Sequence, residues 1–268
     1  MKKIVTTILL SFFVMITYCQ ELYVFSEPAS NMPSKSISLK LTGRFPSSAD
    51  FSQRYMPEAM IGINKYLMVH MSGTLSDFYT KNLQPESGRL YVKYRFYSKD
   101  DIHKHFRMAA FADVSFSKSP YTYEETNLEG DNSGFQYGII ATQLLNKLAI
   151  STTWAYSKLF KVNADKLFLN NPSYHFLNYS LSAGYLLFPK KYTSYKQLNV
   201  NAYAELLGAK SLQNENYSVD LAPAIQFIFN SNSKINLGYR FQIAGHMNRM
   251  ATNTLQISVE HTLFNLWK

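Results

Sequence analysis

Cysteine is almost absent from this 268-residue chain, in which Cys19 is the only one. A single cysteine excludes the disulfide framework of small secreted domains. Glycine and proline are scarce, with 11 and 9 residues, and there is no glycine-rich phosphate-binding loop. No apolar run of about 18 residues follows residue 20, which excludes membrane-spanning helices. Runs of lysine and arginine are also missing, so the net charge of +9 is dispersed and predicts no nucleic-acid partner.

The first 20 residues have the features of a signal peptide. Lys2 and Lys3 precede an apolar run over about residues 4–16, which is too short to span a membrane stably. We expect residues 1–20 to be removed, which lowers the net charge to +7 through the loss of the two lysines. Lipidation of Cys19 is the alternative, but Tyr18 stands where a small residue is expected.

Aromatic residues and alternation are what the chain has in abundance. There are 20 Tyr and 19 Phe, and both residue types favour strands, while Tyr also favours membrane interfaces. In ISLKLTGRF (residues 37–45), apolar residues and glycine take one parity and Ser, Lys, Thr and Arg take the other. Such alternation predicts a strand with one apolar and one polar face. The pattern returns in residues 57–63, 67–75, 89–96, 106–116, 135–145, 148–159, 178–187, 198–206, 219–229, 235–243 and 255–263.

The connections between these segments alternate in length. Those after the second, fourth, sixth, eighth and tenth segments are short, and most of the others are longer. Short turns on one side and long loops on the other are typical of an outer-membrane up-and-down barrel. The sequence therefore predicts an all-β fold, a transmembrane antiparallel β-barrel of about 12 strands within a range of roughly 10 to 14. We expect a periplasmic N-terminal segment over residues 21–35 and the barrel over residues 36–268, with both termini periplasmic.

The direction of the two faces decides between two folds. In a membrane barrel the apolar face contacts lipid and the polar face lines the lumen. In a soluble protein of two stacked sheets, the apolar faces would pack against each other. We favour the barrel, because stacked sheets need neither alternating loop lengths nor aromatic residues at both strand ends. Pro57 and Pro223 should each remove a ladder hydrogen bond, and His261, on the apolar parity, is tolerable only near the rim.

Three stretches resemble one family. They are ELYVFSEPASNMPSKSISLKL (residues 21–41), IHKHFRMAAFA (residues 102–112) and NLEGDNSG (residues 127–134). The chain after residue 20 is similar over most of its length to an outer-membrane β-barrel family of Bacteroidota with no established activity. The resemblance implies a barrel in the outer membrane of a Gram-negative bacterium. It implies no functional residues.

Charged residues on the polar parity are expected to line the lumen. If residues 98–101 close a hairpin, Lys93 lies near Arg107 and Arg95 near His105, and such like charges are unfavourable when they face each other. They persist if carboxylates across the lumen or a bound anion neutralise them. The basic set is Arg44, Arg89, Lys93, Arg95, His105, Arg107 and Arg240, and the acidic set is Glu58, Asp113, Glu205, Asp220 and Glu260.

These charges support two functions. One is a structural or surface-interaction barrel whose lumen is closed by salt bridges and which transports nothing. The other is a porin-like channel or transporter for small solutes. Because basic groups around a pore favour anions, the second function carries a mild anion preference, and it is the function that we predict.

A group of soft ligands raises the question of metal binding. A turn at residues 64–66 would set Met60 opposite His70, with Met68 beside them. Thioether and imidazole together suit Cu(I). Methionine commonly fills irregular space, however, so packing is the favoured interpretation. We therefore expect no metal site and no cofactor.

The stretch around residue 130 resembles part of a calcium loop. Glu129, Asp131 and Ser133 alternate before a glycine, but Ile140 stands where a bidentate acid is expected. A solvated turn is the favoured interpretation. A divalent ion or a surface ligand at this loop is the alternative.

Catalytic residues have no recognisable arrangement. Asp113 and Ser115 share a face, but no histidine is placed to complete a triad. His103 and His105 offer two metal ligands without a third. We expect no enzyme, with a lipid-acting hydrolase as the less favoured alternative. The expected partners are outer-membrane lipid, the barrel-assembly machinery during biogenesis and small solutes, and the chain is expected to be a monomer.

Overall fold

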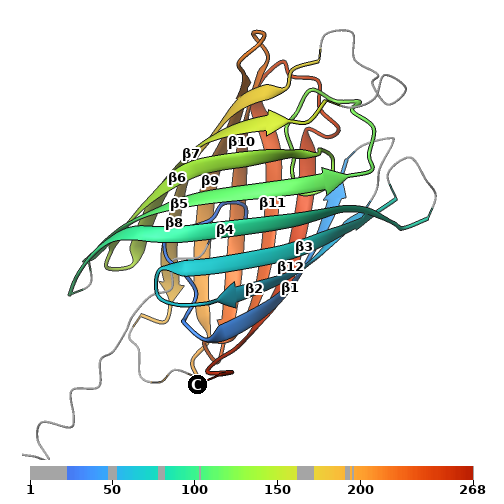
Figure 1. Ribbon diagram of the computed structural model, residues 1–268. Helices are drawn as coiled ribbons and strands as arrows, with labels where there is room; N and C mark the ends of the chain where they lie inside the picture. The colour runs from blue at the N-terminus through green and yellow to red at the C-terminus, as the bar shows by residue number, and fades with distance from the viewer. Residues whose placement is uncertain are drawn as a thin grey trace, which may run out of the picture.

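Twelve antiparallel strands close into a barrel in the computed structural model, which describes residues 23–47, 53–77, 82–102, 104–161, 172–190, 194 and 196–267. Each strand pairs with its neighbours in sequence, and β1 closes the sheet against β12 (Figure 1). The strands are β1 (Ser36–Pro46), β2 (Arg54–Gly62), β3 (Leu67–Ser76), β4 (Gln84–Asp101), β5 (Lys104–Ser117), β6 (Gly134–Leu145), β7 (Leu148–Leu159), β8 (His175–Phe188), β9 (Asn199–Ser211), β10 (Tyr217–Phe229), β11 (Ser233–Gly245) and β12 (Asn253–Leu263). The all-β barrel predicted from alternation is confirmed.

No helix in the described ranges is long and apolar enough to cross a membrane.

The short turns are built by residues that tolerate the left-handed region. Asn146, in the two-residue connection between β6 and β7, has a φ of 55°. Between β10 and β11, Asn230 and Ser231 have φ values of 49° and 58°. Two-residue hairpin turns favour positive φ because it matches the twist of the flanking strands, and asparagine accepts it at low cost. The predicted short connections therefore have a local cause in the sequence.

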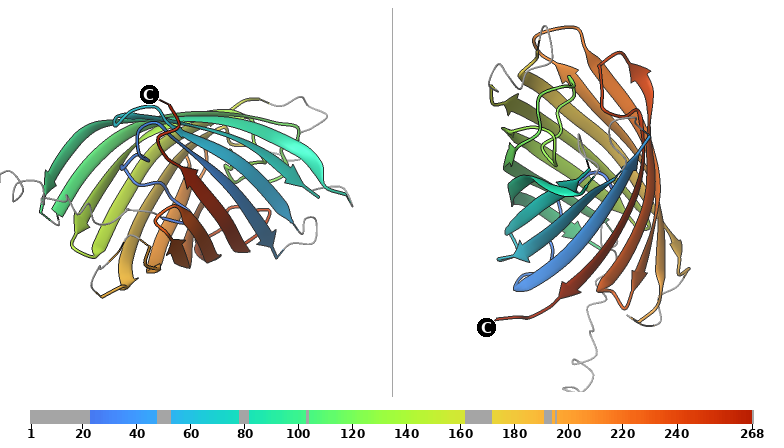
Figure 2. Two further views of the ribbon diagram at one scale, coloured as in Figure 1. Left: turned by 90° about the horizontal axis from the view of Figure 1, so that it is seen from below. Right: turned by 90° about the vertical axis from the view of Figure 1, so that its right-hand side faces the viewer.

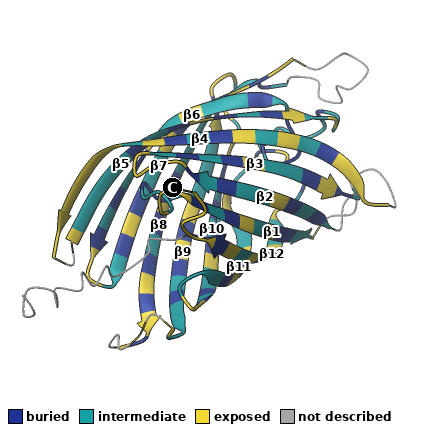
Figure 3. Cartoon of the chain, turned by 60° about the horizontal axis from the view of Figure 1, so that its bottom comes forward, coloured by how far each residue is buried: buried dark blue, intermediate teal, exposed yellow. Residues whose placement is uncertain are grey.

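Apolar side chains cover the outside of the barrel, and polar side chains fill the inside. Leu39 and Trp154 on the outer face are 56% and 57% exposed, whereas Lys93 and Glu205 in the lumen are fully buried. Buried and exposed positions alternate along the strands (Figure 3). A soluble protein has the opposite distribution. The predicted direction of the faces is confirmed, and the alternative of two stacked sheets is wrong.

The irregular residues of the strands lie where the ladder tolerates them. Pro57 of β2 pairs with β1 but has no register partner on β3, and Pro223 of β10 pairs with β9 but has none on β11. Each proline thus interrupts one ladder, as predicted. His261 lies near the end of β12, where its Nδ1 is 2.8 Å from Ser233 Oγ.

The N-terminal segment lies inside the barrel, not outside it. We call residues 23–31 the N-terminal plug, and Figure 2 shows this stretch within the curve of the strands. Tyr23 and Val24 pack against Leu144 and Tyr203 of the wall. Residues 23–31 are held in the lumen because these apolar side chains and the backbone amides beside them find partners on its wall. The side of the membrane on which the segment over residues 21–35 begins stays a prediction.

A long loop also folds inward. We call residues 118–133, between β5 and β6, the inner loop. Its Tyr121 and Leu128 form an apolar cluster with Leu159, Phe176 and Met247 from β7, β8 and the connection after β11. The Thr74 hydroxyl of β3 donates a hydrogen bond of 3.0 Å to the Glu129 carbonyl. The lumen is thus occupied by two segments that are far apart in the sequence.

Candidate functional site: a cavity between two inward segments

A cavity of about 290 Å³ lies in the lumen, with both the N-terminal plug and the inner loop in its wall. Tyr23 to Glu27 of the plug and Thr126 to Glu129 of the inner loop line it together with inward residues of the strands. Its charged lining residues, other than His70, are Glu27, Lys40, Arg44, Glu58, Arg89, Asp113, Glu129 and Arg240. Most of these belong to the sets predicted from the polar parity.

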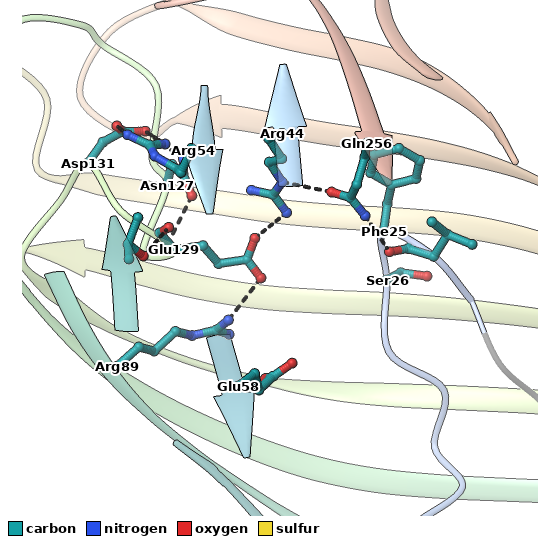
Figure 4. A network of polar contacts seen from close by, with 12 residues as sticks. Phe25, Ser26, Arg44, Arg54, Glu58, Arg89, Asn127, Glu129, Asp131 and Gln256 are labelled. Atoms are coloured by element: carbon teal, nitrogen blue, oxygen red, sulfur yellow. Dashed lines mark hydrogen bonds and ion pairs between the residues drawn. The ribbon is translucent and has the colours of Figure 1, made fainter. Parts of the chain in front are cut away.

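A chain of polar contacts connects the inner loop to the plug (Figure 4). Glu129 forms ion pairs with Arg44 and with Arg89, the latter at 2.9 Å. Arg44 Nε donates to Gln256 Oε1 at 2.7 Å, and Gln256 Nε2 donates to the Val24 carbonyl at 3.0 Å. One carboxylate of the inner loop is therefore shared by two of the predicted lumen arginines.

Glu205 holds the plug from β9. Its carboxylate accepts hydrogen bonds from the backbone N–H groups of Val24, Phe25 and Ser26 at 2.9, 3.0 and 2.8 Å. The Ser182 hydroxyl donates a further bond to it at 3.2 Å. Backbone donors converging on one carboxylate stabilise its charge in a buried place. This predicted acidic lumen residue is therefore satisfied by backbone amides, not by a cation.

Lys93 holds the plug from β4. Its Nζ donates to the carbonyls of Pro28 and Ser30 at 2.7 and 3.0 Å and lies 3.2 Å from Glu27 Oε2. Arg107 Nη1 donates to Ser30 Oγ at 2.8 Å. Two members of the predicted basic cluster thus bind the chain's own N-terminal segment.

The expected clash of like charges between β4 and β5 does not occur. β4 continues to Asp101, and its register against β5 shifts between Arg95 and Tyr97. Lys93 consequently lies opposite Phe111, and Arg95 opposite Ala109. The expected positions of Lys93 and Arg95 beside Arg107 and His105 are therefore wrong.

The same register shift brings Asp100 to the basic residues at the end of the hairpin. Asp100 Oδ1 lies 3.0 Å from Arg107 Nη2 and 2.9 Å from His105 Nδ1. A bulge adds one residue to a strand and reverses the parity beyond it. A carboxylate assigned to the turn thus pairs with Arg107 and His105, one residue from each of the two pairs that were expected to repel.

The remaining predicted charges also form pairs. Asp220 pairs with Arg240 and, at 2.6 Å, with Arg249. Glu260 lies 2.7 Å from Lys234 Nζ. Ion pairs thus connect most of the charges that the sequence predicted to line the lumen.

One ion-paired group, centred on Arg54, was not predicted from the sequence. Arg54 is 2% exposed, and it binds Glu86 at 2.8 Å and also Asp131 of the inner loop. The strand expected from the sequence began at Pro57, whereas β2 begins at Arg54. Arg54 has the same parity as Met56, so extending the alternation by three residues would have placed its side chain in the lumen. Glu86 carried no such signal, because it is the extra residue at a register shift. Its neighbours Pro85 and Ser87 pair with Leu75 and Thr74 of β3, and Glu86 has no register partner there.

The soft-ligand group has the predicted arrangement. Met60 lies opposite His70, and both residues are buried with Met68. His70 Nδ1 is 3.0 Å from Glu58 Oε1, so one ring nitrogen is already engaged by a carboxylate. The described residues contain no group of three or more His, Cys, Asp or Glu side chains that could hold a metal ion. The expectation that no metal binds here stays a prediction, with copper as the less favoured alternative.

The acidic loop residues are engaged by the barrel. Glu129 and Asp131 neutralise arginines, as described above, and the Ser133 hydroxyl donates to the Ser117 carbonyl at 3.2 Å. Both carboxylates pair with lumen arginines, so in this structure they are not arranged as the ligands of a divalent ion. A divalent ion or a surface ligand at this loop stays the less favoured alternative.

The residues considered for catalysis are not brought together. Asp113 is paired with Arg89, whereas His105 lies eight residues away on the same strand. At about 3.4 Å per residue, this separation is on the order of 27 Å. His103 lies outside the described residues. Asp113, Ser115 and His105 therefore cannot act as one triad.

Ionised Glu129 should make the stability of the barrel sensitive to acid. Burial raises the pKa of its carboxyl, but the positive charges of Arg44 and Arg89 outweigh burial and hold that pKa below its usual value. The unfolded chain therefore takes up a proton first as the pH falls below about 4.3. Because the side chain is 37% exposed to the lumen, water screens part of the attraction.

We expect Glu129 to contribute its full stabilisation above its unfolded pKa, and the free energy of unfolding to fall as the pH drops below about 4.3 toward the lowered pKa of the folded state. Glu129→Gln should reduce this loss, as measured by urea unfolding in detergent with tryptophan fluorescence. Glu215→Gln, at an exposed loop position, is the control and should follow the native protein. Equal acid sensitivity of the native protein and Glu129→Gln would contradict the prediction.

Comparisons with known proteins identify the fold. No protein-family model matches the chain, and no curated protein is similar to it in sequence. An outer-membrane channel from Pseudomonas putida F1 is similar in structure, with a TM-score of 0.59, 9% identity and coverage of 90% of this chain and 100% of the other. The NanC porin has a TM-score of 0.52, 12% identity and coverage of 84% and 100%. The Bacteroidota family stays a prediction, and this chain has a barrel fold that outer-membrane channels also have.

Proposed function

We propose that this chain is an outer-membrane channel for small solutes, closed here by its N-terminal plug and its inner loop. It spans the membrane as a monomer with both termini in the periplasm. The observation that carries the proposal is the inside of the barrel, which is lined by charged and polar groups around a cavity and not filled by an apolar core. The polar contacts of the two segments can be exchanged for contacts with water. Their displacement also exposes the apolar clusters that the plug and the inner loop form with the wall.

The apolar outer face supports the location. Exposed leucine, tyrosine and tryptophan side chains cover the strands, and water would leave them unfavourably solvated. In a bilayer this apolar face contacts lipid, while closure of the sheet pairs the backbone hydrogen-bonding groups of every strand. The outer membrane is where barrels of this kind are found.

Conductance tests the channel directly. We expect the purified protein to open in planar lipid bilayers and to prefer chloride over potassium, because basic groups around a pore favour anions. The preference should be mild, because carboxylates already pair most of the lumen cations. The reversal potential in a KCl gradient measures this preference. A cation-selective current would contradict the anion preference, and complete insertion without current would contradict the channel.

The second candidate is a closed structural or surface-interaction barrel. The observation that favours it is the pairing of Arg44, Arg89, Arg107 and Arg240 with carboxylates. A network satisfied in this way gives no reason for an ion to enter. The same bilayer experiment separates the two candidates, because this one predicts insertion with no current.

A further inference from the structure

Three polar atoms that adjacent strands place in the wall of the cavity have no hydrogen-bond partner within the described part of the chain. They are His70 Nε2, the Tyr91 hydroxyl and Asp113 Oδ1. Their residues line the cavity and are 3%, 4% and 5% exposed. Buried polar groups in native proteins are almost always paired with protein, water or ligand. These atoms therefore need a partner that the described residues do not supply.

The three residues form a row on the lumen wall, which we call the polar row. His70 of β3 lies opposite Tyr91 of β4, and Tyr91 lies opposite Asp113 of β5. The ring centroids of His70 and Tyr91 are 4.8 Å apart. Inward residues that face each other on adjacent strands are neighbours. The unpaired atoms thus belong to one patch of the cavity wall.

Other contacts hold each member of the polar row. His70 Nδ1 lies 3.0 Å from Glu58 Oε1, and Asp113 Oδ2 accepts from Arg89 Nε at 3.1 Å. When imidazole donates its Nδ1 proton to a carboxylate, the neutral ring presents Nε2 as an acceptor. Asp113 Oδ1 is also an acceptor, and the Tyr91 hydroxyl can donate or accept. A matching ligand must supply hydrogen-bond donors.

The cavity has no excess of either charge. Four cationic residues, Lys40, Arg44, Arg89 and Arg240, face four carboxylates, Glu27, Glu58, Asp113 and Glu129. Lys40 pairs with Glu58, Arg44 and Arg89 with Glu129, and Arg240 with Asp220. A charged ligand would have to break an ion pair or enter without a counter-ion, which is unfavourable in a buried place. An uncharged ligand needs only hydrogen bonds.

We propose that the cavity binds a small uncharged molecule that carries several hydroxyl groups. Hydroxyls donate to His70 Nε2 and Asp113 Oδ1 and pair in either sense with the Tyr91 hydroxyl. The cavity volume of about 290 Å³ lies at the lower end of small-molecule sites, about 300–1,000 Å³, and suits a molecule of monosaccharide size. The inference names a solute class for the proposed channel and rests on that function, although binding can be measured without conduction.

Binding of three sugars of similar size tests the proposal on the full-length protein in detergent. The probes are glucose, gluconate and glucosamine, which are uncharged, negative and positive, and saturation-transfer NMR titrations measure their affinities. We expect glucose to bind and the two charged analogues to bind severalfold more weakly. Equal or tighter binding of gluconate or glucosamine would overturn the proposal, as would no glucose binding, in which case the cavity holds water alone.

Tyr91→Phe identifies the site. It removes a hydroxyl that has no partner among the residues that the structure describes, so the fold should persist. Glucose binding should weaken about two- to tenfold through loss of one hydrogen bond. Tyr94→Phe, on the outer face of the same strand where Tyr94 is 52% exposed, is the matched control and should bind like the native protein. Unchanged binding by Tyr91→Phe would overturn the assignment to the polar row.

The two measurements separate this inference from the channel. Glucose binding in detergent without current in bilayers would contradict the channel and leave the binding site standing. Current without glucose binding would contradict the binding site and leave the channel standing.

Discussion

Glu205→Ala is expected to release the N-terminal plug and to raise the single-channel conductance. The Glu205 carboxylate accepts three backbone N–H bonds from the plug and is fully buried. Each bond to a charged acceptor contributes about 1.5–3 kcal/mol. Loss of the acceptor would leave three amides unpaired, so we expect docking of the plug to weaken by roughly 3–5 kcal/mol. That change shifts the ratio of docked to released plug by about a hundredfold or more.

Two measurements follow the release. Chymotrypsin should cleave the variant at Tyr23 or Phe25, which the barrel wall protects in the native protein, and open events in planar bilayers should become more frequent. The inner loop still narrows the lumen, so conductance should stay below that of an empty barrel. Deletion of residues 23–31 should give the same conductance as Glu205→Ala.

A graded control separates release from a general loss of stability. Glu205→Gln keeps one carbonyl oxygen as acceptor and should lie between the native protein and Glu205→Ala. Glu215→Gln, at an exposed position outside the strands, should change nothing. Continued protection of Tyr23 and Phe25 in Glu205→Ala would show that this carboxylate does not hold the plug.

Arg54→Gln is expected to destabilise the barrel and to free the inner loop. The Arg54 guanidinium binds Glu86 at 3.0 and 2.8 Å and also binds Asp131. Removing one partner of a buried ion pair costs about 3–5 kcal/mol, because the remaining charges lose their compensation. Here two carboxylates lose the same cation, so we expect a loss of at least that size. Urea unfolding in detergent with tryptophan fluorescence measures it.

Neutralising the whole group tests the cause. Arg54→Met combined with Glu86→Gln and Asp131→Asn removes every charge and should recover much of the stability. Lys99→Gln, at an exposed position of β4, is the control and should change stability by less than about 0.5 kcal/mol. A loss below about 1 kcal/mol in Arg54→Gln would mean that water, not Arg54, compensates the two carboxylates.

The candidate site could be predicted only in part. The parity rule placed Arg44, Glu58, Asp113 and Glu205 on the lumen face, because side-chain direction follows from the local geometry of a strand. It could not place Glu86, since a bulge interrupts the parity there. The bulge after Arg95 likewise changed the partners of the basic cluster. Pairing across strands depends on register, and one extra residue reverses the face of everything beyond it.

The sequence by itself determined the barrel and the direction of its faces. Alternation sets the two faces of each strand, and the lengths of the connections set the order of the strands, so both are local properties of the chain. Only the tertiary structure decided that two segments occupy the lumen, because the contacts that hold them join distant residues, as Val24 and Glu205 are 181 positions apart. Such contacts form when the closed sheet brings opposite walls within reach of one short segment, and no spacing along the chain encodes that distance.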